Sequence, residues 1–190
     1  MASEMIKRFS PILALTAACW IVFWVNALLW HGSLNRYGII PRYTGSLPGI
    51  LFSPFLHGSL DHLLANTVPL LVLGAILCAR NPGEFVLVTL TGILFSGALT
   101  WVIGREAIHI GASGLIFCYF GYLVSLAVFE RTLGAFLLSL FCLLAYGGIL
   151  QGALPTSPNI SWEGHIAGLL SGIAIAWMTP KSRRRARRDY

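Results

Sequence analysis

A serine set among small residues is the first position in this sequence that could do chemistry. Ser113 lies in the run Gly-Ala-Ser-Gly at residues 111–114, inside the largely apolar stretch 109–122. Small neighbours allow another helix and a substrate backbone to come close to the serine, which bulky neighbours would prevent. The same residue types are also ordinary packing residues between transmembrane helices. Ser113 is therefore a candidate nucleophile that needs a partner.

A histidine near the end of the chain is the candidate partner of Ser113. His165 lies in EGHIAGLLSG, where Gly164, Gly168 and Gly172 recur every four residues and form one smooth helix face. That face favours close packing on another helix, which would bring His165 to Ser113. A histidine within hydrogen-bond reach of a serine can take its proton and make it a nucleophile. The alternative is a histidine with only a structural hydrogen bond.

Two polar residues earlier in the chain suggest a second catalytic role. His62 and Asn66 are four residues apart, so their side chains share one face of a helix. Neither is negatively charged, and both can donate hydrogen bonds. Together with the backbone N–H of Ser113, they could hold the oxyanion of a tetrahedral intermediate. The alternative is an ordinary hydrogen bond between helices.

Other catalytic chemistries fit the sequence poorly. The HExxH motif of zinc metalloproteases does not occur, and no predicted helix offers two histidines at a metal-coordinating spacing. The only aspartates are Asp61 and Asp189, which gives no aspartyl pair. Glu163 and Asp61 lie near histidines in the sequence, but neighbouring helix positions point apart. We therefore predict a dyad of Ser113 and His165, without a metal or another cofactor.

The composition predicts a membrane protein. The 190 residues are 56% hydrophobic and 11% charged, with a mean hydropathy of +0.76, whereas soluble domains carry about 25% charged residues. Six apolar spans have the length of a membrane-crossing helix. They cover residues 12–30, 62–79, 85–103, 111–129, 133–150 and 162–178. The predicted fold class is an all-α membrane protein with six transmembrane helices in one bundle.

The regions outside these spans are short, apart from one long connection. We predict a cytoplasmic N-terminus at residues 1–11, one six-helix domain at 12–178 and a basic cytoplasmic tail at 179–190. The connection 32–60 is broken by Pro41, Pro48 and Pro54 but is rich in apolar residues. That composition suits a loop lying partly in the membrane interface.

Lysine and arginine predict the orientation of the spans. Six spans place both termini on one side, and ten of the thirteen basic residues then share that side. The excess indicates that both termini are cytoplasmic. The second, fourth and sixth spans consequently begin at the outer face, which places His62, Asn66, Ser113 and His165 at one depth. Polar side chains inside a membrane usually face a polar interior or a water-filled cavity.

The net charge of +6 comes mostly from the tail KSRRRARR at residues 181–188. A basic run beside a membrane helix marks the cytoplasmic face and contacts anionic lipid. Membrane lipid is therefore the expected partner of the tail, and nucleic acid is not. The sequence does not predict an oligomeric state.

At this point the sequence resembles the rhomboid family of intramembrane serine proteases. The resemblance rests on HGSLDH at 57–62 running into LLAN at 63–66, on GASG at 111–114, and on GHIAG at 164–168 with Gly172. The GxSG motif alone is weak evidence for this family, but the three motifs together, each on the appropriate span, are highly specific to it. The resemblance covers all six spans and implies a six-helix rhomboid-like bundle. It also implies a Ser113–His165 dyad, with His62 and Asn66 at the oxyanion hole.

The resemblance further implies an activity and a substrate class. Peptide bonds would be hydrolysed in or beside the transmembrane segment of another membrane protein, without metal or nucleotide. Two positions depart from the family pattern. Many members carry a Trp-Arg pair where this sequence reads LPGILF at 47–52, and many have tyrosine at the position of Phe117. That tyrosine packs on the catalytic histidine, so here we expect the ring without the hydroxyl.

Two other classes of function remain as alternatives. A non-catalytic relative that binds or escorts membrane proteins should lack the serine or the histidine, and this sequence has both. A small transporter would use broken helices and often internal repeats, and this sequence shows no internal repeat. The small size without an added domain fits, by resemblance, a prokaryotic cytoplasmic membrane as the location.

Overall fold

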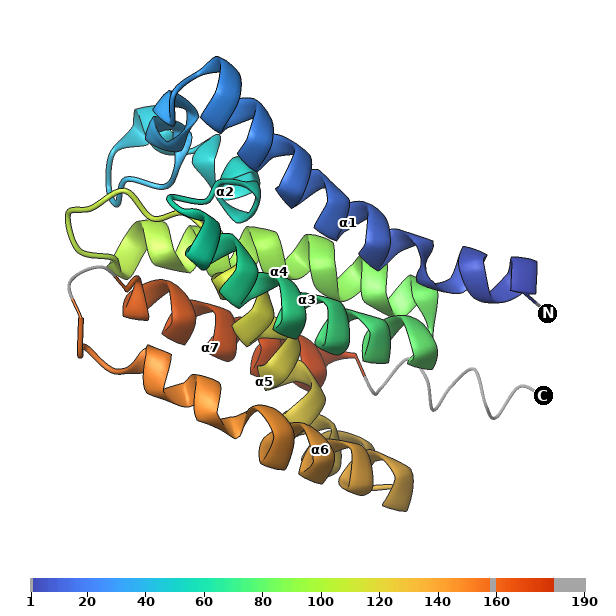
Figure 1. The fold of residues 1–190 in the computed structure, drawn as a ribbon. Helices are drawn as coiled ribbons and strands as arrows, with labels where there is room; N and C mark the ends of the chain where they lie inside the picture. Colours follow the sequence, from blue (N-terminus) through green and yellow to red (C-terminus); the bar gives the residue numbers. More distant parts are fainter. Residues whose placement is uncertain (1, 158–159, 180–190) are drawn as a thin grey trace.

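The structure, a computed structural model, describes residues 2–157 and 160–179. These residues form six long helices and several short helical segments (Figure 1). The long helices are α1 (Ala2–Leu29), α3 (Leu60–Arg80), α4 (Pro82–Ile103), α5 (Ser113–Glu130), α6 (Leu133–Tyr146) and α7 (Trp162–Met178). The beginning of α1 and the end of α7 lie at the same end of the bundle. The predicted all-α membrane bundle is confirmed.

Among the residues that the structure describes, five helical stretches are long and apolar enough to cross a membrane. They are Ser3–Leu29, α3, α4, α5, and Leu133–Ala153, which joins α6 to the 3-10 segment η4 (Gly147–Ala153). The sixth predicted span is α7, whose 17 residues are one fewer than the 18 of α5. Together these helices make the chain a multi-pass membrane protein.

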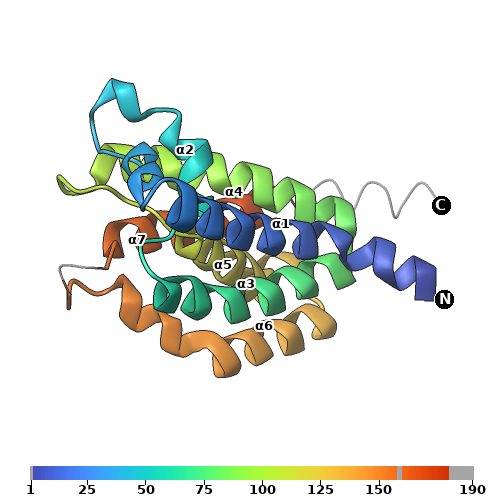
Figure 2. The same cartoon turned by 45° about the horizontal axis from the view of Figure 1, so that its top comes forward.

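The first helix begins earlier than the predicted span. It starts at Ala2 and continues through Pro11, so residues 2–11 of the predicted N-terminal segment are helical. In Figure 2 this end extends beyond the rest of the bundle. The Arg8 guanidinium donates hydrogen bonds to the carbonyl oxygens of Cys78 and Ala79. A cation at the C-terminal end of α3 is favourable because the last carbonyls of a helix carry partial negative charge.

The long connection between α1 and α3 is built from short helical segments. They are η1 (Ser33–Tyr37), η2 (Thr44–Ser46), α2 (Gly49–Phe52) and η3 (Ser53–Phe55). Pro48 precedes α2 and Pro54 lies in the first turn of η3, where a missing N–H costs no helical hydrogen bond. The prolines thus divide the connection into short segments. Its position relative to the membrane interface stays a prediction.

The fifth helix, α5, is the centre of the bundle. It contacts α3, α4, α6 and α7, and in Figure 1 it crosses between them. Residues 115–123 are all buried, which is possible because the helix is apolar on every face. Ser113 is its first residue, so the candidate nucleophile sits at one end of the most enclosed element.

Helix α7 packs directly on the backbone of α5. A Cβ atom at Gly168 would collide with the carbonyl oxygen of Gly114, and one at Gly172 with that of Cys118. Conversely, a Cβ at Gly121 would come 2.6 Å from the carbonyl oxygen of Leu169. The predicted packing face of α7 is confirmed, and it lies against the helix that carries Ser113.

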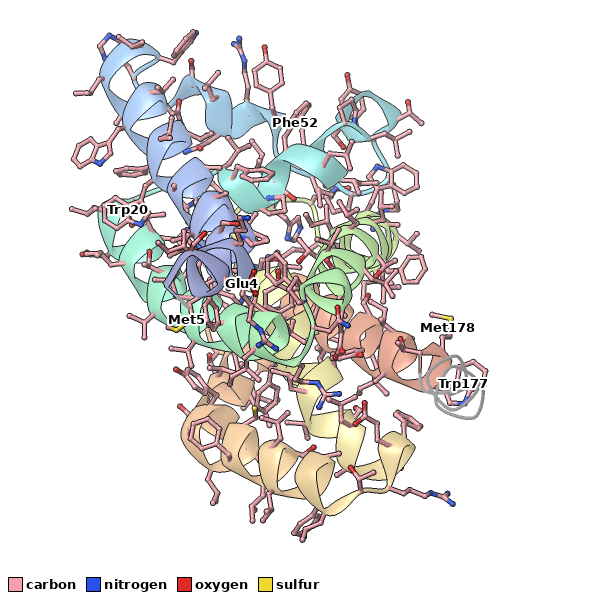
Figure 3. All side chains as sticks on the ribbon, turned by 90° about the vertical axis from the view of Figure 1, so that its right-hand side faces the viewer. Glu4, Met5, Trp20, Phe52, Trp177 and Met178 are labelled. Atoms are coloured by element: carbon pink, nitrogen blue, oxygen red, sulfur yellow. The ribbon has the colours of Figure 1, made fainter. Side chains whose placement is uncertain are left out.

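Large apolar side chains project outward around the bundle. Figure 3 labels Phe52, Trp177 and Met178, whose exposed fractions are 54%, 60% and 50%. Many leucines and phenylalanines of α6 are similarly exposed. A water-facing surface seldom carries so much contiguous apolar area. The surface therefore fits a lipid environment.

A polar network ties the helices together at the end opposite the candidate site. Arg80 at the end of α3 lies 3.0 Å from Glu84 of α4 and 2.6 Å from Glu130 of α5. The Tyr122 hydroxyl donates to Glu84 at 3.0 Å. Because Glu84 is almost fully buried, its charge needs these partners. The network thus fixes α3, α4 and α5 relative to one another.

We predict that Gly168→Ala or Gly172→Ala destabilises the protein by about 1–3 kcal/mol, since a methyl group would push α7 away from the backbone of α5. Thermal unfolding in detergent measures the effect. Gly134→Ala in α6 is the matched control, because nothing lies within 4 Å of its Cβ position. Equal melting temperatures for all three variants would contradict the close packing.

Candidate active site

The structure brings Ser113 and His165 together. Nε2 of His165 lies 2.8 Å from Oγ of Ser113, a hydrogen-bonding distance between residues 52 positions apart in the chain. His165 belongs to the first turn of α7 and has an exposed fraction of only 9%. The two side chains come from helices that touch through Gly168. Helix packing therefore sets their separation.

The imidazole ring of His165 is held by two further contacts. The ring of Phe117 stacks on it with centroids 4.3 Å apart and planes 8° from parallel. Phe117 lies one turn after Ser113 on α5, so one helix presents both the serine and the stacking ring. On the other side, Nδ1 of His165 lies 2.7 Å from the carbonyl oxygen of Gly152 in η4. The expected ring contact without a hydroxyl is present.

Helix α3 brings His62 and Asn66 to the loop that precedes Ser113. Both lie near the start of α3, where the Ser59 hydroxyl accepts the N–H of His62 and caps the helix. A Cβ atom at Gly111 would lie 2.6 Å from Nε2 of His62 and 3.4 Å from Nδ2 of Asn66. Gly111 also has a φ of +113°, which an L side chain rarely adopts. Glycine is required there for both reasons.

A third histidine supports Asn66. His57 is buried, and its Nε2 lies 3.1 Å from Nδ2 of Asn66 and 3.5 Å from the backbone nitrogen of Ala112. Its Nδ1 lies 3.4 Å from the carbonyl oxygen of Phe55. Because that oxygen only accepts, His57 carries its proton on Nδ1 and accepts the Asn66 amide with Nε2. His57 thus orients Asn66.

The sequence analysis did not assign this role to His57, although the residue is part of the HGSLDH motif. Burial, together with the neighbouring His62, lowers the pKa of His57 to about 4. The ring is therefore neutral near pH 7 and keeps the lone pair that accepts Asn66. The hydrogen bond to the Phe55 carbonyl opposes this shift only in part.

The loop between α4 and α5 is fixed on both sides. The backbone of His109 makes two hydrogen bonds with Ile39, at 3.0 and 2.8 Å, and Gly111 N–H donates to Ser53 O at 2.9 Å. The His109 ring lies 2.5 Å from Oγ of Ser161 and 3.1 Å from the carbonyl oxygen of Arg105. The connection before α3 and the start of α7 thus clamp the segment that ends at Ser113.

The two carboxylates near the histidines have other neighbours. Glu163 is buried and lies 3.5 Å from the Arg105 guanidinium, which also donates to the carbonyl oxygen of Ile160 at 2.7 Å. Asp61 is exposed. Within residues 2–157 and 160–179, Nε2 of His165 faces the hydroxyl of Ser113, and Nδ1 faces the carbonyl oxygen of Gly152. That part of the chain also holds no group of three or more metal-ligating side chains.

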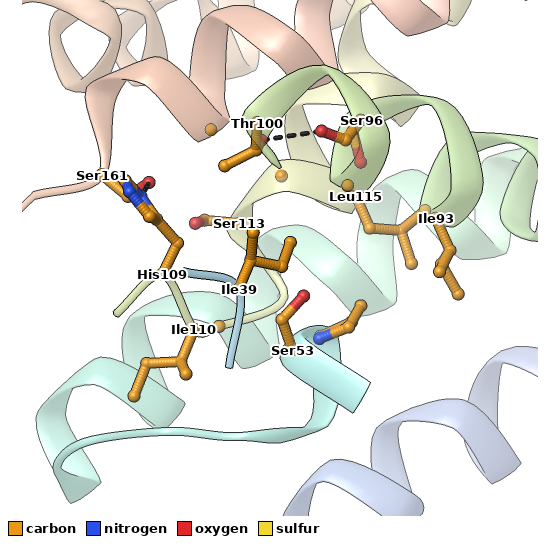
Figure 4. A pocket seen from close by; sticks show the side chains of 15 residues that line it. Ile39, Ser53, Ile93, Ser96, Thr100, His109, Ile110, Ser113, Leu115 and Ser161 are labelled. Atoms are coloured by element: carbon orange, nitrogen blue, oxygen red, sulfur yellow. Dashed lines mark hydrogen bonds between the residues drawn. The ribbon is translucent and has the colours of Figure 1, made fainter. Parts of the chain in front are cut away.

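Ser113 opens onto a pocket at the end of α5. The pocket measures about 390 Å³ including its opening, and Figure 4 shows the Ser113 hydroxyl beside Ile39, His109 and Ile110. Its walls come from α4, α7, the connection before α3 and the loop before α5. The Ser96 and Thr100 hydroxyls in the wall donate to backbone carbonyls one turn earlier in α4. Oγ of Ser113 thus borders a small pocket that is open to the surroundings.

Comparisons with known proteins point to one family. A model of the Rhomboid domain matches residues 44–182. Proteins named only as uncharacterized in Mycobacterium tuberculosis and Mycobacterium leprae are each 37% identical to this chain. The alignments cover 94% and 93% of the chain, and 78% and 73% of those relatives.

A more distant relative carries a functional name. The Bacillus subtilis protein named "Putative rhomboid protease YdcA" is 25% identical over 92% of the chain and 89% of its own length. The matched region 44–182 includes Ser113, His165, His62 and Asn66, and all the residues that line the pocket apart from Ile39. The family match therefore spans the four predicted site residues.

The neutral state of His57 predicts a pH dependence of stability. Its pKa is about 4 in the folded protein against an ordinary 6.5, so the unfolded chain binds the proton more strongly. Stability should fall as the pH drops from 6.5 towards 4, by about 3 kcal/mol from this residue at most. Melting temperatures of wild type and His57→Gln, from about pH 7 to pH 4.5, measure it. Glutamine can accept the Asn66 amide but does not titrate, so equal losses in both proteins would contradict the assignment.

Proposed function

The chain belongs to the rhomboid family, and we propose that it is an intramembrane serine endopeptidase that cleaves transmembrane segments of other membrane proteins. The observation that carries the proposal is the 2.8 Å separation between Ser113 Oγ and His165 Nε2. Nucleophile and base must lie within such a distance for proton transfer. The pocket beside Ser113 supports the same reading, because a substrate carbonyl must reach Oγ.

In the first half of the proposed reaction, Ser113 Oγ attacks the scissile carbonyl carbon and its proton passes to His165 Nε2. The substrate carbonyl oxygen becomes an oxyanion, and Asn66, His62 and the Ser113 N–H are the proposed donors to it. His165 then gives the proton to the leaving amine as the C–N bond breaks. The product of this half is an ester between Ser113 and the remaining substrate.

In the second half a water molecule takes the place of the amine. His165 removes a proton from the water, the resulting hydroxide adds to the ester carbonyl, and the Ser113 oxygen leaves with the proton from His165. A carboxylic acid is released and Ser113 is restored. Protons balance over the cycle without a metal ion or a redox cofactor, because the base and acid are the same imidazole.

The proposal includes the setting of the reaction. We place the protein in the cytoplasmic membrane with both termini in the cytoplasm, on the basis of the ten-to-three division of lysine and arginine. The site then lies in the outer half of the bilayer. A transmembrane substrate would be cut close to its outer end.

The dyad is tested by removing its members singly and together. Ser113→Ala and His165→Ala should each abolish cleavage of a single-pass model substrate, and the double variant should be little worse than either, since the two act as one unit. Ser125→Ala is the matched control, because it removes a hydroxyl from α5 beyond the site. Every variant should remain folded, Ser113→Ala should keep the melting temperature of Ser125→Ala, and labelling by a serine-directed fluorophosphonate should disappear with Ser113. A folded Ser113→Ala protein that cleaves at the wild-type rate would end the serine-peptidase proposal. A folded wild-type protein that neither cleaves nor takes the label would favour the escort or transporter alternatives.

The oxyanion donors are tested by kinetics. Asn66→Ala should lower kcat by about 10²–10³-fold, with a much smaller change in KM, since the donor matters most as charge develops on the oxygen. The measurement is a substrate titration in detergent for Asn66→Ala and His62→Ala. If both variants are folded and cleave at the normal rate, the pair only packs helices.

A further inference from the structure

The carbonyl oxygen of Gly152 determines which nitrogen of His165 carries the proton. Nδ1 of His165 lies 2.7 Å from this oxygen, and Nε2 lies 2.8 Å from Ser113 Oγ. A backbone carbonyl can only accept, so the hydrogen in the first contact must sit on Nδ1. Nε2 of the neutral ring is then left with its lone pair directed at the serine hydroxyl. This is the tautomer that a general base for Ser113 requires.

The same contact fixes the rotation of the ring. The stack with Phe117 holds the plane of the imidazole, but the same plane is kept when the ring flips by 180° about the Cβ–Cγ bond, which exchanges its nitrogen and carbon positions. The hydrogen bond from Nδ1 to the Gly152 carbonyl selects one of these two orientations, the one with Nε2 towards Ser113. We propose that this carbonyl is the positioning group of His165, in the role that a carboxylate has in a catalytic triad. The proposal rests on the peptidase function proposed above.

Glycine at position 152 allows the carbonyl to approach. A Cβ atom there would lie 3.0 Å from Nδ1 of His165, 3.3 Å from Cε1, and 3.5 Å from Cζ of Phe117. A side chain would therefore press on the ring that the carbonyl holds. The φ angle of Gly152 lies outside the left-handed region, so alanine is compatible with the backbone and its effect comes from contact with the ring.

The hydrogen bond between Gly152 and His165 links the orientation of the His165 ring to the position of η4. Gly152 belongs to η4, which continues α6 and lies against α7. Helix α6 packs mainly on α5, and most of its remaining surface is exposed. A displacement of η4 away from α7 would remove the acceptor from Nδ1 and release the ring. The alignment of the base thus depends on the position of η4.

Two alanine variants of η4 test the proposal. Gly152→Ala should lower kcat for a single-pass substrate by about 10- to 100-fold while KM changes little, because only the base is misaligned. Gly148→Ala is the matched control: it lies in the same segment, and nothing is within 4 Å of its Cβ position. Both variants should remain folded, since alanine restricts the unfolded chain more than glycine and this gain offsets part of the contact between the Gly152→Ala methyl group and the ring. A Gly152→Ala protein with the kcat of Gly148→Ala would overturn the proposal.

A spectroscopic measurement tests the proposal without activity. In ¹⁵N NMR of histidine-labelled protein, with His165 assigned by its loss in His165→Ala, the neutral ring should show a protonated Nδ1 and an unprotonated Nε2. Gly152→Ala should mix the two tautomers, and Gly148→Ala should not. A protonated Nε2 in the wild type would overturn the positioning role. If the tautomer is as expected but no variant, including wild type, cleaves or binds the fluorophosphonate, the peptidase function fails instead.

A backbone ester tests the role of the Gly152 carbonyl as an acceptor without adding the methyl group that Gly152→Ala introduces. Replacing Ala153 by lactic acid turns the Gly152 carbonyl into an ester carbonyl, a weaker acceptor of nearly the same shape. The same exchange at Ala145, in α6, controls for the loss of a backbone N–H. The ester at 153 should lower kcat in the same direction as Gly152→Ala. Equal kcat for the two esters would show that the carbonyl does not position His165.

Discussion

The contact between the backbones of α5 and α7 is the constraint on which the candidate site depends. Gly168 and Gly172 let α7 rest on the carbonyl groups of Gly114 and Cys118. Ser113 begins the first of these helices, and His165 lies one turn before Gly168 on the second. If α7 moved away from α5 by about 1 Å or more, Oγ and Nε2 would leave hydrogen-bonding distance. The distance between Ser113 and His165 therefore depends on glycines, because their lack of a side chain allows the close helix contact.

Around this contact, most polar groups are hydrogen-bonded to other groups of the protein. The loop before α5 is bonded to Ile39, Ser53 and Ser161, and His57 holds the amide of Asn66. In a low-dielectric surrounding, an unpaired polar group costs more than it does in water. Pairing them at the mouth of α5 therefore stabilises the fold and also directs their side chains. Here stability and preorganisation come from the same hydrogen bonds.

The sequence predicted the parts of this arrangement that side-chain type and spacing encode. The six apolar stretches and the glycine face of α7 follow from periodicity and composition, and Phe117 was expected on His165 by resemblance. The early start of α1 was missed because residues 1–11 look polar, while Arg8 finds its partners on α3 only in the folded bundle. Gly152 had no signal at all. Its contribution is a backbone carbonyl, which every residue possesses, and only the path of η4 makes it significant.

The 3-10 form of η4 determines how far along its helical stretch the Gly152 carbonyl lies. Its seven residues rise about 2.0 Å each, against about 1.5 Å in an α-helix, so conversion to α-helix would shorten the segment by about 3.5 Å. η4 ends a stretch that begins at Leu133 and is long and apolar enough to cross a membrane. A change of helix type within η4 would therefore move the Gly152 carbonyl relative to His165 by more than a hydrogen bond tolerates.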